Sequence, residues 1–435
     1  MKAEPDRPST EAIDQHARRN FWTLGLVQIA IRTGWIFKTE NIIMPVVLDT
    51  MGGAAWLRGF LPMFSRGAYS LSPWLLSHRF NQMKRKKWGL CIAIVGMSAC
   101  FAILSFLWMI AGGQASTWMP IIFFAAYASF FVCAGMTQLG FGTLQGKLVR
   151  ATRRGRLMLL GNVGGAAVAI VGAAVLLPSW LRSGGGDFHW IFACSAFFFL
   201  VSALIASRLV EPSDETQQQP QEGVVHFAES WKILRRDIPF QRVAWVAFFF
   251  GTSFVLFPHY QALGHARFGF EFSDLISWII IQNAGTAVLS MVAGLLADWR
   301  GNRLVLRLLL LGLCLLPPAA LALANFEQFG KSHYWGVFVL IGLTPVTLRT
   351  LQNYTLELAP VNNYPRYLST MGLCVAAPIM TAPLIGLAID TWGFEEVFFG
   401  ISALLFAGWL QTLRLSEPRQ KASAEMITGR INVES

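Results

Sequence analysis

Long apolar runs recur through the whole sequence, and they restrict its fold more than any other feature. About twelve runs reach about 20 residues, long enough for a helix rising about 1.5 Å per residue to cross about 30 Å of hydrocarbon. They lack the apolar/polar alternation of transmembrane β-strands. Hydrophobic residues make up 54% of the chain and charged residues 14%, against about 25% charged in soluble proteins. We therefore predict an all-α membrane protein. The predicted spans are residues 21–48, 54–77, 88–110, 118–146, 157–179, 188–208, 242–263, 274–297, 304–324, 334–357, 367–389 and 394–414.

The second half of the chain repeats features of the first half. Residues 208–212 read Arg-Leu-Val-Glu-Pro and residues 414–418 read Arg-Leu-Ser-Glu-Pro, each closing an apolar stretch, and Lys147 aligns with Glu357. Such duplication places the binding site of one transporter class where two halves meet. We predict twelve transmembrane helices in two pseudo-symmetric six-helix bundles. The predicted organisation is a first half at 1–210, a cytoplasmic linker at 211–241, a second half at 242–418 and a cytoplasmic tail at 419–435.

Basic residues are concentrated in alternate loops. They cluster before the first span and after the second, fourth, sixth and eighth spans, whereas the intervening loops hold few. By the positive-inside rule both termini are cytoplasmic, and we assign the chain to the inner membrane of a bacterium. The net charge of +11 thus reflects orientation, and no nucleic-acid partner is expected. Polar residues 214–220 predict a flexible linker, followed at 227–236 by a short amphipathic helix on the membrane surface.

One loop carries a specific motif. Residues 294–303 read Gly-Leu-Leu-Ala-Asp-Trp-Arg-Gly-Asn-Arg, which fits G-x-x-x-D-x-x-G-x-R between the eighth and ninth spans. With its twelve spans and cytoplasmic linker, the chain resembles the major facilitator superfamily of secondary transporters. The resemblance implies that Gly294, Asp298, Gly301 and Arg303 form a gating latch, with Gly294 allowing close helix contact and Gly301 a tight turn.

The first-half copy of this motif is degenerate. His78 stands at the acidic position, and the turn contains no glycine. Because a neutral or cationic imidazole is not a permanent anion, we expect the first half to gate differently from the second. Elsewhere, Gly161, Gly165, Ala169 and Gly172 predict close helix approach along the fifth span. Two prolines, Pro378 and Pro383, are expected to bend the eleventh span.

Ionisable residues also occur at membrane depth. Arg32, Arg66 and Arg349 lie near the middle of their spans, where a lipid-facing arginine costs about 2.5–3.5 kcal/mol on insertion scales. By analogy with the family, spans 1, 4, 7 and 10 line a central cavity, to which span 7 adds His259 toward its outer end. The predicted solute-binding residues are Gln28, Arg32, Gln138, Arg349, Gln352 and Asn353.

Alternative roles stay open for the charged residues. Arg32 and Arg349 are interpreted as facing one another and binding an anionic group, and structural ion pairs are the alternative. For Arg66 a structural pair with Glu40, Asp49 or helix carbonyls is the favoured interpretation. Glu40 is a proton-coupling candidate and alternatively the structural partner of a buried base.

These features predict a secondary active transporter that moves a small organic solute, anionic or amphiphilic, by alternating access. Its expected partners are the solute, the lipid bilayer and a coupling proton or ion. The alternative is a non-transporting membrane scaffold or assembly factor. An enzyme is not expected, because phosphate-binding loops and catalytic constellations are missing from the sequence. The six cysteines lie within predicted spans without C-x-x-C spacing, so neither a cofactor nor a metal is expected.

Overall fold

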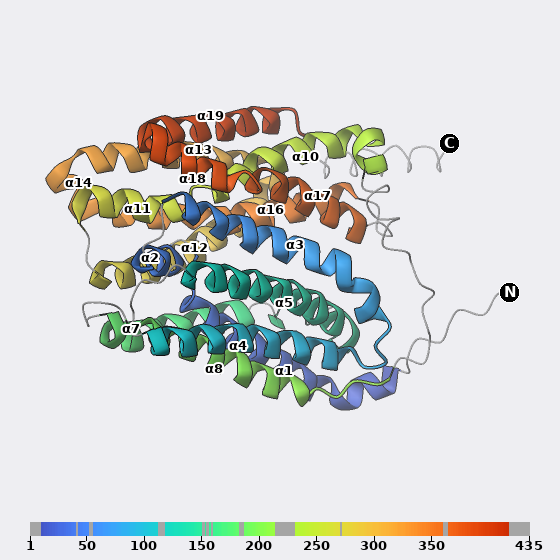
Figure 1. Ribbon diagram of the computed structural model, residues 1–435. Helices are drawn as coiled ribbons and strands as arrows, with labels where there is room; N and C mark the ends of the chain where they lie inside the picture. Colours follow the sequence, from blue (N-terminus) through green and yellow to red (C-terminus); the bar gives the residue numbers. More distant parts are fainter. Residues whose placement is uncertain are drawn as a thin grey trace, which may run out of the picture. The chain divides into compact units, whose positions relative to one another are not determined.

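The computed structural model describes residues 10–40, 42–51, 55–111, 118–149, 153, 156–157, 160–181, 187–213, 231–269, 272–359 and 364–416. These residues form helices and connecting turns without a β-strand (Figure 1), so the all-α prediction is confirmed. Two compact units are present: Met1–Thr39, Val46–Gly53 and Leu71–Glu222 form unit 1, and Glu40–Pro45, Ala54–Ser70 and Gly223–Ser435 form unit 2. Residues 231–236 are helical. The predicted linker at 214–220, the start of the surface helix and the tail at 419–435 lie outside the described residues.

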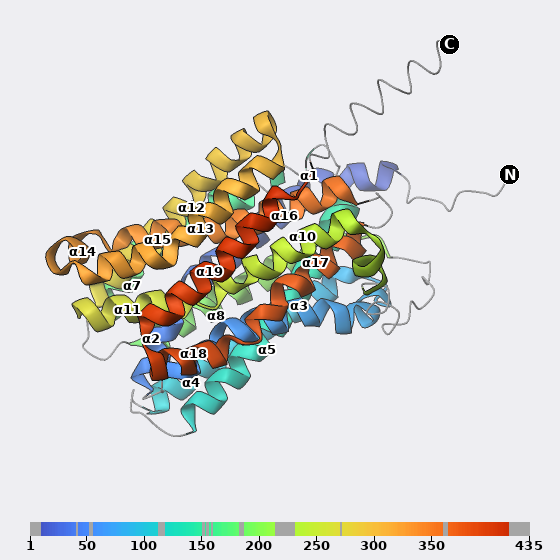
Figure 2. The ribbon, with the colours of Figure 1, turned by 90° about the horizontal axis from the view of Figure 1, so that it is seen from above.

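Unit 1 has a core of aromatic side chains between long helices. Phe101 contacts the rings of Phe130, Phe192 and Phe199 at centroid distances of 4.9, 5.9 and 6.1 Å. α4 therefore packs on α5 and α8, and Figure 2 shows α4 and α5 side by side. The elements are α1 (Thr10–Ile36), most of α2 (Ile43–Thr50), the second part of α3 (Phe60–Asn81), α4 (Lys86–Ala111), α5 (Met119–Leu148), the π-helical turn η2 (Leu160–Gly164), α7 (Gly165–Leu181) and α8 (Phe188–Ser207).

Unit 2 packs α13 against α19 and α10 against α17. Trp278 stacks on Phe338 at 4.4 Å, and the buried hydroxyl of Tyr334 donates to the carbonyl of Tyr260 at 2.7 Å. The elements are η1 (Ala55–Gly59), the first part of α3, α10 (Ile238–Gly251), η3 (Thr252–Phe254), α11 (Phe257–Phe268), α12 (Phe272–Arg300), α13 (Asn302–Asn325), α14 (Glu327–His333), α15 (Trp335–Ile341), α16 (Leu343–Leu358), α17 (Tyr364–Ile379), α18 (Ala382–Trp392) and α19 (Phe394–Leu413).

Every predicted span coincides with helical structure, but several spans are interrupted. The first breaks between α1 and α2, the seventh at η3, the tenth at Gly342 and the eleventh at Met380 and Thr381. The last break directly follows Pro378, in keeping with the expected bend. Within the described residues, nine helices are long and apolar enough to cross a membrane. The membrane character is thus confirmed, and the count of twelve crossings stays a prediction.

The repeated Arg-Leu-x-Glu-Pro segments close the last helix of each half in the same way. The Arg19 guanidinium donates to the carbonyl oxygen of Arg208 at 3.2 Å, and Arg242 donates to that of Arg414 at 2.9 Å. These bonds satisfy carbonyl groups that a helix end leaves without a partner. The repeated sequence segments are therefore matched by a repeated hydrogen bond, from an arginine to the carbonyl group at the end of a helix. The half boundaries predicted at 210 and 242 stay a prediction.

The glutamate of the first repeat does more than close a helix. Glu211 has a fully buried side chain and accepts hydrogen bonds from the backbone N–H groups of Lys86 and Lys87 at 3.1 and 2.8 Å. The ammonium of Lys147 adds an ion pair at 2.9 Å. A carboxylate at the start of α4 also complements the positive end of that helix. Its counterpart Glu417 lies outside the described residues.

Candidate solute-binding and gating site

In unit 1, the candidates Gln28 and Arg32 of α1 lie against glycines of η2 and α7. A Cβ added to Gly161 would come within 2.8 Å of the Gln28 Cβ, and one added to Gly165 within 3.0 Å of the Arg32 Cβ. Because Gly161 and Gly165 have no side chains, Gln28 and Arg32 fit against them. Gln28 and Arg32 are half-buried. This is the close approach that the glycine spacing predicted. The π-helical turn beside it is a feature often found at functional sites.

The third candidate of unit 1 lies on a neighbouring helix. Gln138 is exposed on α5, one residue after the buried Thr137, and α5 packs against α1. All three unit 1 candidates, Gln28, Arg32 and Gln138, therefore occupy adjacent helices of one unit. Their binding of a solute stays a prediction.

In unit 2, the candidates form an accessible stripe on α16. Arg349 and Asn353 are exposed and Gln352 is half-buried, whereas Leu351, on the opposite side of the helix, is buried. The i, i+4 spacing places Arg349 and Asn353 on one face, as predicted from the sequence. Arg32 and Arg349 belong to different units. Their expected face-to-face placement stays a prediction.

Near Glu40, the structure contains an aromatic box that the sequence did not predict. Lys38 is 0% exposed, and its ammonium lies 3.8 Å from the ring centroid of Trp35 and 4.1 Å from that of Phe131. Such cation–π contacts stabilise a charge away from water. Phe131 lies on α5, far from Lys38 in sequence, so periodicity within a single helix could not have revealed the box. Glu40 is half-buried, and its coupling role stays a prediction.

The latch motif forms the turn between α12 and α13. Gly301 has φ of 85°, the left-handed region that glycine tolerates, so the tight turn expected there is confirmed. Arg303 donates to the carbonyl of Leu415 at 3.4 Å. No described atom lies within 4 Å of a Cβ added to Gly294, so the close helix contact expected at Gly294 is not seen in this part of the structure. The side chains of Asp298 and His78 lie outside the described residues.

The contacts of Arg66 differ from the structural pair that was predicted for it. Its guanidinium carbon lies 4.1 Å from the ring centroid of Phe254, and its Nε is buried without a hydrogen-bond partner. Within the described residues, Arg66 makes neither an ion pair nor a hydrogen bond. The predicted pair with Glu40, Asp49 or a helix carbonyl is therefore not formed. The contact involves the interrupted seventh span, which the sequence read as continuous.

Further polar side chains of unit 2 are buried without a hydrogen-bond partner among the described residues. Ser253 is adjacent to Phe254 in η3, and His259 follows in α11 with both ring nitrogens unsatisfied and 0% exposure. Gln261 and Thr344 also belong to this group. An unsatisfied buried polar atom costs about 1–3 kcal/mol, so several of them in one unit call for an explanation such as a ligand or bound water.

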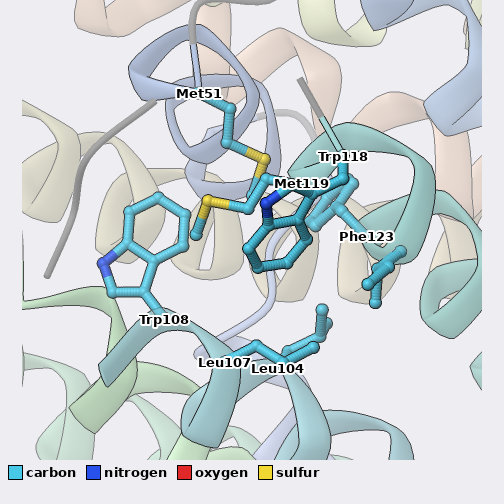
Figure 3. A pocket seen from close by; sticks show the side chains of 8 residues that line it. Met51, Leu104, Leu107, Trp108, Trp118, Met119 and Phe123 are labelled. Atoms are coloured by element: carbon cyan, nitrogen blue, oxygen red, sulfur yellow. The ribbon is translucent and has the colours of Figure 1, made fainter. Parts of the chain in front are cut away.

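A small pocket of unit 1 is shown in Figure 3, and it contains none of the polar candidates. Its lining consists of Met51, Leu104, Leu107, Trp108, Trp118, Met119, Ile122 and Phe123. These apolar and aromatic side chains carry no charge to bind an anionic group. Among the described residues there is also no cluster of His, Cys, Asp and Glu that could hold a metal ion.

The sequence matches the family model of the Major Facilitator Superfamily over residues 75–348, more than half of the chain. Comparison with curated proteins gives no match. Solved structures that share the fold include those of a nucleoside transporter and of POT family transporters.

The first is the nucleoside transporter NupG, with 12% identity and a TM-score of 0.64 over 91% of this chain and 98% of that chain. The second is a POT family transporter in complex with 5-aminolevulinic acid, with 12% identity and a TM-score of 0.71 over 91% and 95%. The third is the peptide transporter POT in complex with sulfate, with 13% identity and a TM-score of 0.69 over 92% and 97%. The family match indicates a membrane transporter, and these neighbours show that the fold is the same. By the extent of the family match, the chain belongs to the major facilitator superfamily.

Proposed function

We propose that this protein is a secondary active transporter that moves a small organic solute, anionic or amphiphilic, across the bacterial inner membrane by alternating access. The observation that carries the proposal is the exposed stripe of Arg349 and Asn353 on α16. A guanidinium on a membrane helix is costly when it faces lipid, so an exposed one favours an aqueous space that a solute can enter.

Each candidate residue has a role in this proposal. Arg32 and Arg349 donate bidentate hydrogen bonds to the anionic group of the solute, because a guanidinium fork fits a carboxylate or phosphate. The amides of Gln28, Gln138, Gln352 and Asn353 bind its neutral polar groups. Glu40 carries a coupling proton. Gly294, Asp298, Gly301 and Arg303 act as the latch that controls access, with both termini in the cytoplasm.

The solutes named for similar structures differ widely, since they include nucleosides, peptides and 5-aminolevulinic acid. At 12–13% identity they do not identify the solute of this chain. Peptides and 5-aminolevulinic acid do carry carboxylates, which makes them suitable members of a test panel.

The test has two steps. First, thermal unfolding of the purified protein is measured with carboxylates, organic phosphates, cations and neutral metabolites, because a ligand of the native state raises apparent stability. Second, stabilising solutes are offered to proteoliposomes with an imposed proton gradient. We expect anionic solutes to raise the unfolding temperature and to accumulate. Stabilisation by cations alone would contradict the solute class. Stabilisation without transport by any solute would favour the scaffold or assembly factor.

A further inference from the structure

Arg66 is a cation at membrane depth whose donors are not used within the described part of the protein. Its guanidinium rests against the ring of Phe254, and it makes no hydrogen bond or ion pair among the described residues. The N–H groups of a guanidinium lie in its plane, whereas stacking on a ring uses its face. Contact with Phe254 therefore leaves the bidentate edge of Arg66 available to an acceptor.

The surroundings of Arg66 are built from two interrupted spans of unit 2. Phe254 belongs to η3, the break in the seventh span. Next to Arg66 along α3, a Cβ added to Gly67 would come within 3.0 Å of the Met380 side chain, at the break between α17 and α18. Interrupted helices at membrane depth are the usual way in which transporters build ligand sites, because they supply polar groups within hydrocarbon.

The residue before Phe254 in the chain also has a side chain without a hydrogen-bond partner among the described residues. The hydroxyl of Ser253 is in the same 3-10 turn as Phe254, is 5% exposed and makes no hydrogen bond to any described residue. A hydroxyl donor and a cation together suit an acceptor with several oxygen atoms. Two unsatisfied donors, one against the ring of Phe254 and one on the residue before it in the chain, point to a ligand rather than to an internal ion pair.

We propose that Arg66, Phe254 and Ser253 form an oxyanion site, in which the Arg66 fork binds a carboxylate or phosphate and the Ser253 hydroxyl donates a further hydrogen bond. The ring of Phe254 holds the guanidinium and shields it from lipid. The site deepens the proposed function and rests on it, since the anionic group is assigned to the transported solute. Arg66 thereby becomes a specificity residue of unit 2 in addition to Arg349.

The test uses the full-length protein and two probes, sodium acetate and sodium phosphate, each compared with sodium chloride at equal ionic strength. Thermal unfolding is followed for the wild type, Arg66→Gln, Arg66→Lys, Phe254→Leu and the matched control Arg79→Gln. Arg79 is an exposed arginine on the same helix. Acetate and phosphate distinguish the two sources of the oxyanion.

We expect at least one probe to stabilise the wild type and the control equally. Arg66→Gln should weaken the apparent affinity by about tenfold or more, because hydrogen bonds to a charged group are lost. Arg66→Lys should retain the charge and lose part of the affinity. Without a probe, Arg66→Gln should unfold at the same temperature as the wild type or a higher one, since it removes a charge that has no internal partner.

Three results would overturn the site. One is that Arg66→Gln binds the probe with unchanged affinity. If Arg66→Gln does not fold, unchanged probe affinity in both Arg66→Lys and Phe254→Leu has the same meaning. Another is lower stability of Arg66→Gln without a probe combined with unchanged affinity, the behaviour of a purely structural cation. The third is an equal loss in Arg79→Gln. The variants Arg32→Gln and Arg349→Gln test the proposed function separately. If they weaken binding and Arg66→Gln does not, the proposed function survives without this site.

Discussion

Lys38 in unit 1 and Arg66 in unit 2 are two cations at membrane depth, and their surroundings differ. Lys38 is enclosed by rings, with centroids of Trp35 and Phe131 at 3.8 and 4.1 Å from its ammonium and Phe130 at 5.0 Å. Arg66 rests on the single ring of Phe254 at 4.1 Å. The first charge is enclosed by protein contacts, whereas the donors of the second make no hydrogen bond among the described residues.

The same contrast extends to other buried polar groups. In unit 1, Glu211 accepts from two backbone N–H groups and one ammonium, and the Ser98 hydroxyl donates to the carbonyl of Ala196 at 2.7 Å. In unit 2, Ser253 and His259 are buried without a hydrogen-bond partner among the described residues. Within the described residues, buried side chains with an unsatisfied polar atom are thus more numerous in unit 2 than in unit 1.

The largest expected effect compares two glutamates at helix ends. Glu211→Ala should destabilise the protein by about 3 kcal/mol, because it removes a buried carboxylate that pairs with the Lys147 ammonium and accepts from two N–H groups at the start of α4. Glu357, the residue aligned with Lys147, accepts a hydrogen bond from the neutral Asn302 side chain at 2.9 Å. Because loss of a bond to a neutral donor costs less than loss of an ion pair, Glu357→Ala should cost about 1 kcal/mol. Denaturant unfolding of both variants measures the difference, and equal losses would break the contrast between the units.

A second comparison concerns glycines on corresponding spans. Gly161→Ala should destabilise the protein by about 1–3 kcal/mol, because its Cβ meets that of Gln28. Gly372 on α17 has open space around an added Cβ, so Gly372→Ala should be neutral or stabilise by about 0.5–1 kcal/mol through reduced freedom of the unfolded chain. Thermal unfolding of the two variants measures this difference in stability. An unchanged unfolding temperature in Gly161→Ala would show that α1 shifts to accommodate the added methyl group.

A smaller effect is expected for two buried serines. Ser98→Ala in unit 1 removes a formed hydrogen bond and should cost about 1 kcal/mol. Ser253→Ala in unit 2 removes a hydroxyl without a described partner and should leave the ligand-free stability unchanged or slightly raised. The two side chains are 7% and 5% exposed, so burial is matched. A larger loss for Ser253→Ala would mean that its hydroxyl is satisfied in the protein, and would count against the oxyanion site.

Substitutions at the latch are expected to change stability least, and their effect is measured as access to the cytoplasmic side. Asp298→Asn should increase labelling of a cysteine at Asn353 from the cytoplasmic side, because weaker charge-assisted hydrogen bonds favour the inward-open state. The matching first-half variant His78→Asn should change the labelling less. Equal changes in inside-out vesicles would contradict the proposed asymmetry of the two copies.

The sequence predicted the features that depend on local pattern. Apolar length placed helical structure at each predicted span within the described residues, the glycine of the latch placed the Gly301 turn, and i, i+4 spacing placed Arg349 with Asn353. The short helix α14 (Glu327–His333) lies outside the predicted spans. The contacts of Lys38 with Phe131 and of Arg66 with Phe254 could not be predicted, because each joins residues far apart in the chain. The break at η3 was also missed, although Pro258 carried a signal for it. This proline lies at the start of α11 and has no N–H group to donate to the carbonyl of Phe254, four residues earlier.

The central claim is that deep arginines bind an anionic solute, and affinity in arginine variants tests it most directly. Once the panel has given a stabilising solute, its apparent affinity is measured in folded Arg32→Gln and Arg349→Gln protein and in the corresponding lysine variants. We predict a loss of about tenfold or more for glutamine, since charged hydrogen bonds disappear, and a smaller loss for lysine, which keeps the charge without the fork. Unchanged affinity in both folded glutamine variants would contradict the account and return the two arginines to a structural role.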